Sequence, residues 1–262
     1  MIIDCHTHIY PQKIADKAVK YIGEFYTLSM HRDCSGTAEE LLSEMDSAGI
    51  DRAAILAVSQ APDQTHKINE FAAATAAAHP RLFGLGTIHI EQQDILAEVE
   101  HIKSLGLNGL KLHPDMQKFN ADDERLFPVF DLLSQYKLPL MLHAGDFRFG
   151  YSHPDRIKNI CDNFPRLTVV AAHFGGWSMF DLAFEVLENT NAVVDTSSSF
   201  AFLGKRRSLE LIRLYGTDRV MFGSDYPMWK PGDELTTLLS LGLSDTELER
   251  ILHLNAERVF NL

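Results

Sequence analysis

The chain opens with the stretch MIIDCHTH, residues 1–8, in which a short apolar run leads into an Asp-x-His-x-His pattern. Such a run is typical of a parallel β-strand that is buried on both faces. Because side chains alternate along a strand, His6 and His8 share one face while Cys5 points the other way. This stretch therefore predicts a first strand that presents two imidazoles near its carboxyl end.

Seven further stretches of the same kind follow, each short, largely apolar and mostly bounded by Gly, Pro, Asn or Asp. They cover residues 52–59, 82–89, 109–113, 138–143, 167–173, 192–197 and 219–225. Helical patterns separate them, and capping boxes at Thr37 and Ser244 mark two helix starts. Eight strands that alternate with helices predict an α/β fold, a single-domain (β/α)8 TIM barrel over residues 1–262.

Residues 9–36 interrupt this rhythm, because they form an extended connection between the first strand and the helix expected from Thr37. Pro11 can begin a helix within this segment. The apolar residues that would share one face of that helix are Ile14, Ala18, Tyr21, Ile22 and Phe25. Three interpretations stay open: a lid, a contact between subunits, or a helix that plugs the end of the barrel.

The composition excludes several classes of protein. Acidic residues outnumber basic ones by 36 to 24, and the resulting formal net charge of −12 argues against a nucleic-acid partner. No apolar run reaches the length of a membrane span, about 18 residues, and the first residues lack the features of a signal peptide. The three cysteines do not form a disulfide framework, so we expect a cytoplasmic protein with no membrane partner.

Potential metal ligands stand at the ends of five predicted strands, and in a barrel of this type those ends form the active face. The residues concerned are His6, His8, Lys111, His113, His143, His173 and Asp225. Imidazoles together with one carboxylate suit a divalent ion, with Zn²⁺ preferred and Mn²⁺, Fe²⁺ or Co²⁺ as alternatives. Such an ion lowers the pKa of bound water from 15.7 toward about 7 and makes hydroxide available.

The motifs resemble the amidohydrolase superfamily, and most closely the amidohydrolase-related branch that also contains aminocarboxymuconate-semialdehyde decarboxylase. Besides the opening Asp-x-His-x-His, the matching segments are GLKLHP at 109–114, AHFGG at 172–176, GSDYP at 223–227 and NAER at 255–258. The resemblance covers essentially the whole chain. It is specific for the superfamily and leaves the substrate undetermined.

This resemblance implies roles for individual residues. One divalent ion would be bound by His6, His8, His143 and Asp225. His173 would orient or deprotonate the metal-bound water or polarise the substrate. Asp225 would act both as a ligand and as a proton shuttle, and general acid–base help of this kind is worth roughly 10²–10⁴ in rate.

Lys111 leaves a second arrangement open. In some members of the superfamily a carboxylated lysine on the fourth strand bridges two ions, and His143 and His173 would then bind the second ion. We prefer a single ion, because Lys111 stands two residues before the strand end and His113 takes the outer position. A further interpretation is an ion pair between Lys111 and Asp4 inside the barrel.

Four basic residues near this face, Lys111, His113, Arg148 and Lys230, indicate a small anionic substrate. Of these, Lys111, His113 and Arg148 are the candidate substrate contacts. Arg148 can hold a carboxylate with two parallel hydrogen bonds, although a surface salt bridge explains it equally well.

We therefore expect a metal-dependent hydrolase in which an activated water attacks an amide, ester or lactone carbonyl of a small-molecule substrate that can itself carry a carboxylate. The alternative is a non-oxidative, metal-dependent decarboxylase (a carboxy-lyase) that uses the same site. A non-catalytic metal-binding barrel is a second alternative. A homodimer is the general expectation for an enzyme of this size.

Overall fold

The structure, a computed structural model, describes residues 1–27 and 34–262 and contains all eight predicted strands. They are β1 (Ile3–Thr7), β2 (Arg52–Leu56), β3 (Leu82–Leu85), β4 (Leu110–Leu112), β5 (Leu140–Leu142), β6 (Val169–Ala171), β7 (Val193–Asp195) and β8 (Val220–Met221). Each strand lies inside its predicted range. Each is also shorter than predicted, because the polar residues at the predicted ends belong to the loops that follow.

The strands form a parallel barrel, which confirms the predicted TIM-barrel fold. Strands β1 to β3 pair in order, as do β4 to β8. Two parallel bridges join these groups, one between Gly86 and Leu110 and one between Thr7 and Tyr226. The neighbouring backbone hydrogen bonds are short, with 2.7 Å from the Lys111 N–H to the Gly86 carbonyl and 2.7 Å from the Asp225 N–H to the His6 carbonyl. Strand β8 and the loop after it therefore lie directly beside β1.

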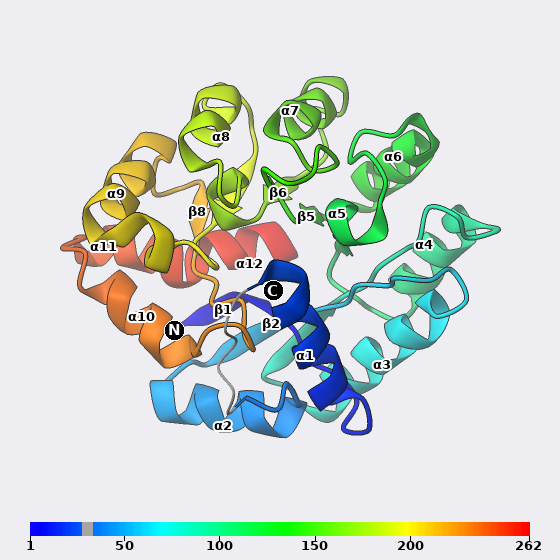
Figure 1. The fold of residues 1–262 in the computed structure, drawn as a ribbon, viewed down its shortest axis with the longest axis horizontal. Coiled ribbons are helices and arrows are strands. Elements are labelled where there is room, and N and C mark those ends of the chain that lie inside the picture. The colour runs from blue at the N-terminus through cyan, green and yellow to red at the C-terminus, as the bar shows by residue number, and fades with distance from the viewer. Residues whose placement is uncertain (28–33) are drawn as a thin grey trace.

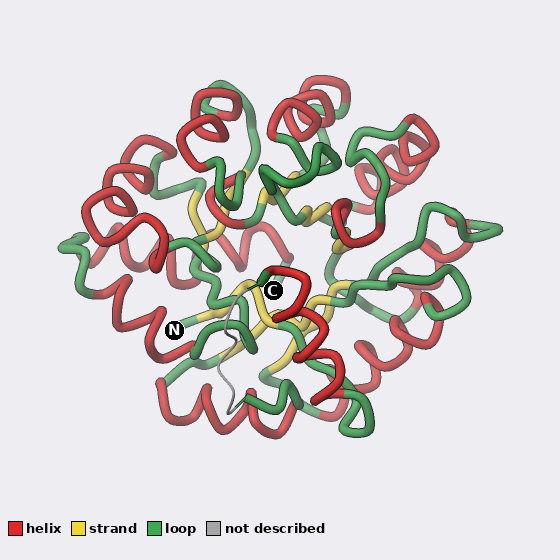
Figure 2. Tube along the Cα trace, in the orientation of Figure 1, coloured by secondary structure: helices red, strands yellow, loops and turns green. Residues whose placement is uncertain are grey.

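Helices surround the strands, as Figures 1 and 2 show. The outer elements are α2 (Ala38–Ala48), α3 (Thr65–Ala78), α4 (Ile95–Ser104), α6 (Phe127–Tyr136), α7 (Pro154–Asn163), α8 (Phe180–Leu187), α9 (Phe200–Tyr215), α10 (Pro231–Leu239) and α11 (Asp245–Glu249). Helix α12 (Asn255–Phe260) instead lies behind the centre of the barrel in Figure 1 and packs against side chains of the strands. A short helix α5 (Pro114–Gln117) follows β4, and 3-10 turns lie at Glu124–Leu126 and His173–Gly175. Within residues 1–27 and 34–262, no helix combines the length and the apolar character that a membrane crossing requires.

Apolar side chains bury both faces of the strands. In β5, Leu140 and Leu142 belong to the large cluster that includes apolar residues of the helices, while Met141 belongs to a second, smaller cluster. That smaller cluster also contains Met221 of β8 and Phe260 of α12. This alternation explains why the sequence of each strand is almost continuously apolar.

Helix α1 (Ala15–Tyr26) lies within the interrupting segment and crosses the barrel end in Figure 1. The expected helix is thus present, although it begins after Pro11. Its predicted apolar face is packed only in part, because Ile22 and Phe25 lie against the core while Ile14 and Tyr21 are 50% and 44% exposed. The residues of α1 that are fully buried are Ala15, Val19, Gly23 and Tyr26. Most of the predicted face borders an open cavity, described below. The remainder of the segment includes residues 28–33, which lie outside the described residues.

Of the two predicted capping boxes, one is complete in the structure and the other is only half formed. At Ser244 the box is complete: the Ser244 hydroxyl accepts from the Glu247 N–H, and the Glu247 carboxylate accepts from the Ser244 N–H. At Thr37 only one half forms, with the Thr37 hydroxyl accepting from the Glu40 N–H. The Glu40 carboxylate accepts instead from the Ser35 N–H and the Tyr226 hydroxyl. This glutamate therefore ties the start of α2 to the loop after β8.

Candidate metal centre and substrate cavity

Three predicted ligands converge at the carboxyl ends of β1 and β8. One donor atom from each of His6, His8 and Asp225 lies within 4.8 Å of the other two. The Nε2 atoms of His6 and His8 stand 3.4 and 3.5 Å from Oδ1 of Asp225. Burial, together with the nearby Lys111 ammonium, lowers the pKa of His6 to about 3, so its imidazole is neutral and can donate a lone pair.

The opposite ring nitrogens of both histidines are fixed by hydrogen bonds. His6 Nδ1 lies 3.0 Å from Oδ2 of Asp195, and His8 Nδ1 donates to the Leu56 carbonyl at 3.1 Å. These partners place the ring proton on Nδ1 and leave both Nε2 lone pairs facing Asp225, as is usual for metal-binding histidines. The Ser198 hydroxyl donates to Oδ2 of Asp225, which keeps Oδ1 directed toward the imidazoles.

Asp195, which the sequence did not single out as a site residue, forms hydrogen bonds with two residues of the site. Burial opposes its charge, but His6 and His173 together with the Ser197 hydroxyl lower the pKa of Asp195 well below its usual range. Its carboxylate accepts from His6 and from the backbone N–H of His173 at 3.0 Å. One buried aspartate therefore orients residues from two different strand ends.

His143 and His173 lie beside each other, and the His173 ring also lies close to that of His6, with centroids 5.0 Å apart. His173 Nε2 and His143 Nδ1 are 3.0 Å apart, and His173 Nδ1 donates to the Ser197 carbonyl at 3.0 Å. The loops that carry these two histidines approach closely. A Cβ atom added at Gly145 would lie only 2.5 Å from the Cα of Gly176, so only glycine fits there. The structure thus joins His143 to His173 rather than to the cluster of His6, His8 and Asp225.

His143 nevertheless has an unused donor atom. Its Nε2 is buried and has no hydrogen-bond partner within the described part of the chain, and it lies 3.8 Å from Oδ2 of Asp115. The ring stacks on His113 with centroids 3.9 Å apart. Burial lowers the pKa of His143 well below 6.5, and the neighbouring imidazoles add to that effect. A neutral, buried and unpartnered imidazole nitrogen is suited to a metal ligand.

Lys111 is almost fully buried at the floor of the site, with its Nζ 3.4 Å from His6 Nε2. Burial lowers the pKa of Lys111 to about 8, although Asp195 and Asp225 oppose that change. Asp4, the ion-pair partner that the sequence offered, instead accepts backbone N–H groups of His6 and Ser224 at 3.1 and 2.9 Å. The ammonium group of Lys111 is therefore directed toward the candidate ligands.

Of the candidate substrate contacts, His113 lies in the cavity and Arg148 lies outside it. His113 lines the cavity, and its Nε2 lies 2.6 Å from the hydroxyl of Tyr26, a residue that the sequence did not single out. Arg148 is not among the cavity-lining residues. It forms an ion pair with Asp146 at 2.7 Å and donates to the Phe25 carbonyl at 2.6 Å. The salt-bridge interpretation of Arg148 therefore describes its place in the structure, where it ties the end of α1 to the loop after β5.

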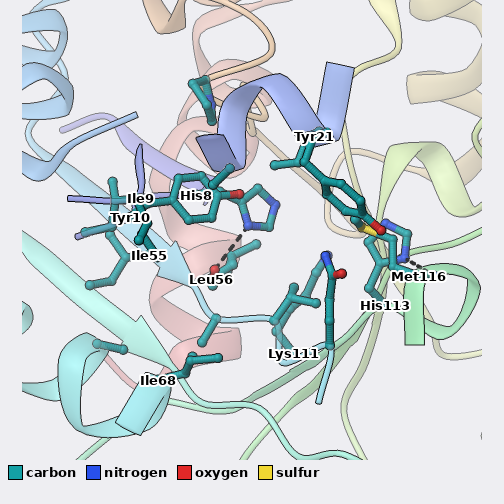
Figure 3. Close-up of a pocket in the computed structure, with 18 of the residues that line it drawn as sticks. His8, Ile9, Tyr10, Tyr21, Ile55, Leu56, Ile68, Lys111, His113 and Met116 are labelled. Atoms are coloured by element: carbon teal, nitrogen blue, oxygen red, sulfur yellow. Dashed lines mark hydrogen bonds between the residues drawn. The ribbon is translucent and has the colours of Figure 1, made fainter. Parts of the chain in front are cut away.

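A cavity of about 710 Å³ leads to these residues. Its walls are largely apolar, and Figure 3 shows Tyr21 of α1 and Ile68 of α3 on opposite sides. Its polar floor consists of His6, His8, Lys111, His113, His143, His173 and Asp225. Apolar walls that end in a few converging polar groups are typical of a site for a small organic molecule.

Glu234 beside the site predicts a measurable dependence of stability on pH. This residue is buried, its Oε2 has no partner, and burial, with Asp4 and Asp225 nearby, raises its pKa from 4.5 to about 8. The unfolded chain loses this proton near pH 4.5 and the folded chain near pH 8, so stability falls as the pH rises between these values.

Glu234→Gln should therefore be more stable than the wild type at pH 8.5 by up to about 5 kcal/mol, since the pKa rises by about 3.5 units and each unit corresponds to about 1.4 kcal/mol. Urea denaturation of both proteins at pH 5 and pH 8.5 measures this difference, which should shrink at the lower pH. Asp233→Asn, at the exposed neighbouring position, is the matched control. Equal stabilities at pH 8.5 would show that the Glu234 carboxyl ionises freely in the folded state.

The chain belongs to the amidohydrolase family, because the model of that family, described as "Amidohydrolase", matches residues 3–262. It is therefore an enzyme of the amidohydrolase superfamily, as the motifs indicated. The chain is similar to 2-amino-3-carboxymuconate-6-semialdehyde decarboxylase of Dictyostelium discoideum, with 24% identity over 324 residues that cover 97% of this chain and 90% of the relative.

Two solved structures illustrate the shared fold. An uncharacterised TIM-barrel protein, Bb4693 from Bordetella bronchiseptica, has a TM-score of 0.81 at 22% identity and covers 99% of this chain and 98% of its own. The 5-carboxyvanillate decarboxylase of Novosphingobium aromaticivorans has a TM-score of 0.79 at 19% identity, with coverages of 100% and 97%. That decarboxylase was solved with manganese and 3-methoxy-4-hydroxy-5-nitrobenzoic acid.

These comparisons correct the expected activity. The hydrolysis of an amide, ester or lactone is wrong as the main interpretation, because the curated relative is a decarboxylase, as are several proteins of the same fold. The physical reason for the error is that one set of ligands can polarise either a carbonyl or a carboxylate oxygen. The motifs report the ligands and carry no information on which bond breaks.

Proposed function

We propose that the protein is a metal-dependent, non-oxidative decarboxylase that removes CO₂ from a small unsaturated or aromatic carboxylic acid. The observation that carries the proposal is the cavity floor, where the buried Lys111 ammonium stands beside the donor atoms of His6, His8 and Asp225. A carboxylate can be held there while the apolar walls cover the rest of the molecule. The decarboxylase relative supports the same activity.

The donor set suits one divalent ion. His6, His8 and Asp225 would hold it, whereas His143, the fourth ligand that the motifs implied, groups with His113 and Asp115 in the structure. When bound, such an ion acts as a Lewis acid toward the oxygens of the substrate. Imidazole and carboxylate donors accept Zn²⁺ or Mn²⁺, and Mn²⁺ occupies the decarboxylase from Novosphingobium aromaticivorans.

The residues of the floor divide the remaining tasks. The Lys111 ammonium binds the substrate carboxylate, and the apolar walls exclude water. The bond between carbon and the carboxylate then breaks, its electron pair stays on carbon, and a proton takes the place of CO₂. His173 passes that proton, because it shares a hydrogen bond with His143 at 3.0 Å and is oriented by Ser197 and Asp195. Asp225 is the second candidate proton carrier at the floor.

His173→Asn should lower the rate of CO₂ release by about 10²-fold, the usual contribution of a general acid. Metal content should stay unchanged, since His173 is not among the proposed ligands. The rate is followed by coupled CO₂ detection, and metal content by atomic absorption. A variant that loses metal along with activity would support the arrangement in which Lys111 bridges two ions and His173 binds one of them.

Solvent deuterium distinguishes decarboxylation from every hydrolytic activity. The metal-loaded protein is incubated in D₂O with 5-carboxyvanillate, 2,6-dihydroxybenzoate or aminocarboxymuconate semialdehyde. We expect CO₂ and a product with deuterium at the vacated carbon, read by NMR. Turnover that yields cleaved product without CO₂ would overturn the proposal. The cytoplasmic location, the homodimer and the absence of nucleic-acid or membrane partners stay predictions from the sequence.

A further inference from the structure

A second group of metal-ligand side chains lies outside the barrel, between α3 and α4, which are neighbours in Figure 1. His66 and Glu70 stand one turn apart on α3, and His101 belongs to α4. One donor atom from each of the three lies within 4.8 Å of the other two. The two imidazoles stack with centroids 4.1 Å apart and an interplanar angle of 18°. None of the three lines the cavity or belongs to the floor cluster.

A buried carboxylate orients His66. Glu98 of α4 is only 6% exposed, and its two oxygens accept from Asn69 at 2.7 Å and Gln92 at 3.2 Å. His66 Nδ1 donates to the same carboxylate at 3.3 Å. This contact places the ring proton on Nδ1 and turns the Nε2 lone pair outward, the arrangement of a carboxylate–histidine–metal triad.

Two features of the group call for a cation. His66 Nε2 lies 3.6 Å from Oε1 of Glu70, so with the proton on Nδ1 a lone pair faces a carboxylate oxygen. His101 Nε2 is buried and has no hydrogen-bond partner among residues 1–27 and 34–262, which is uncommon for an imidazole nitrogen. The three residues together offer two imidazoles and one carboxylate, a typical zinc ligand set that water completes.

We propose that His66, Glu70 and His101 form a second transition-metal site, of the Zn²⁺ type, which links α3 to α4. We call it the α3–α4 site. Helix α3 also supplies Lys67, Ile68 and Phe71 to the cavity wall, so an ion at this site would fix that wall in place. The proposal is independent of the activity proposed above, because it shares no residue with the cavity floor.

The test counts bound metal with Zn²⁺ as the probe. Wild type, His66→Gln, His101→Ala and His79→Ala are dialysed against Zn²⁺ and then against metal-free buffer, and zinc per chain is measured by atomic absorption. His79 follows α3 and belongs to no ligand group among the described residues, so its variant is the matched control. His66 is 56% exposed in its side chain, so His66→Gln keeps the test decisive if His101→Ala does not fold.

We expect about two equivalents for the wild type and for His79→Ala, and about one for His66→Gln and His101→Ala. If the wild type held about one equivalent and His101→Ala none, the α3–α4 site would stand while the barrel site failed. Equal zinc in the wild type and both site variants would overturn the α3–α4 site, whatever the activity.

Discussion

Asp225→Asn is expected to reduce CO₂ release by about 10³-fold or more and to lower the metal content of the barrel site. Oδ1 of Asp225 is the atom on which the Nε2 atoms of His6 and His8 converge. An amide oxygen is uncharged and a weaker ligand for a hard divalent ion. Activity and metal per chain are measured on the same preparation.

The control for this variant is Asp63→Asn. Asp63 also lines the cavity but is exposed at its rim, so its loss should leave both metal content and rate nearly unchanged. If Asp225→Asn kept its metal and more than a tenth of the activity, the carboxylate would be neither a ligand nor a proton carrier. The proposed metal site at the cavity floor would then have to be abandoned.

Lys111→Met is expected to lower kcat/KM by roughly 10²–10³-fold, mainly through KM. The buried ammonium is the cation at the cavity floor, and removing one partner of a buried ion pair costs about 2–5 kcal/mol. Methionine has a similar length and keeps the buried volume, and a calorimetric scan shows that the variant is folded at the assay temperature. Steady-state kinetics of the metal-loaded variant then measures kcat and KM separately.

Lys67→Met provides the comparison, because Lys67 is an exposed lysine at the cavity rim. A Lys111→Met variant with unchanged KM would mean that the substrate carboxylate binds elsewhere. A variant that lost one of two barrel-site ions would favour a carboxylated, bridging lysine instead.

Local patterns in the sequence predicted the fold well. Each apolar run bounded by turn residues became a strand, because both faces of a barrel strand are buried and most of its positions are therefore apolar. The reciprocal box at Ser244 also formed as predicted. The face of α1 could not be predicted in the same way, since Ile14 and Tyr21 border a cavity rather than a packed core. Periodicity identifies an apolar face but not whether solvent or substrate space lies against it.

The candidate site could be predicted in part, because residues at strand ends must meet on one face of the barrel. His6, His8 and Asp225 came together for that reason. Contacts that depend on loop geometry could not be predicted. Asp195 bonds to His6 across the barrel, and Arg148 turns back to Asp146, and neither pairing has a signal in residue spacing.

The sequence motifs could not distinguish hydrolysis from decarboxylation, and the reason is chemical. Imidazole and carboxylate donors hold the same kind of ion in both reactions. What differs is the group held beside the ion, which depends on the cavity. The buried Lys111 and the apolar walls favour a carboxylate attached to an apolar framework, but this combination becomes visible only when the strands are assembled.

The most direct test of the account is CO₂ release by metal-free protein as a divalent ion is added back. The account predicts no CO₂ before addition, an increase with Mn²⁺ or Zn²⁺ until the barrel site is filled, and no increase at any concentration for Asp225→Asn. CO₂ release that persists in excess chelator would contradict the account. So would an Asp225→Asn variant that reaches the wild-type rate of CO₂ release when the ion is added.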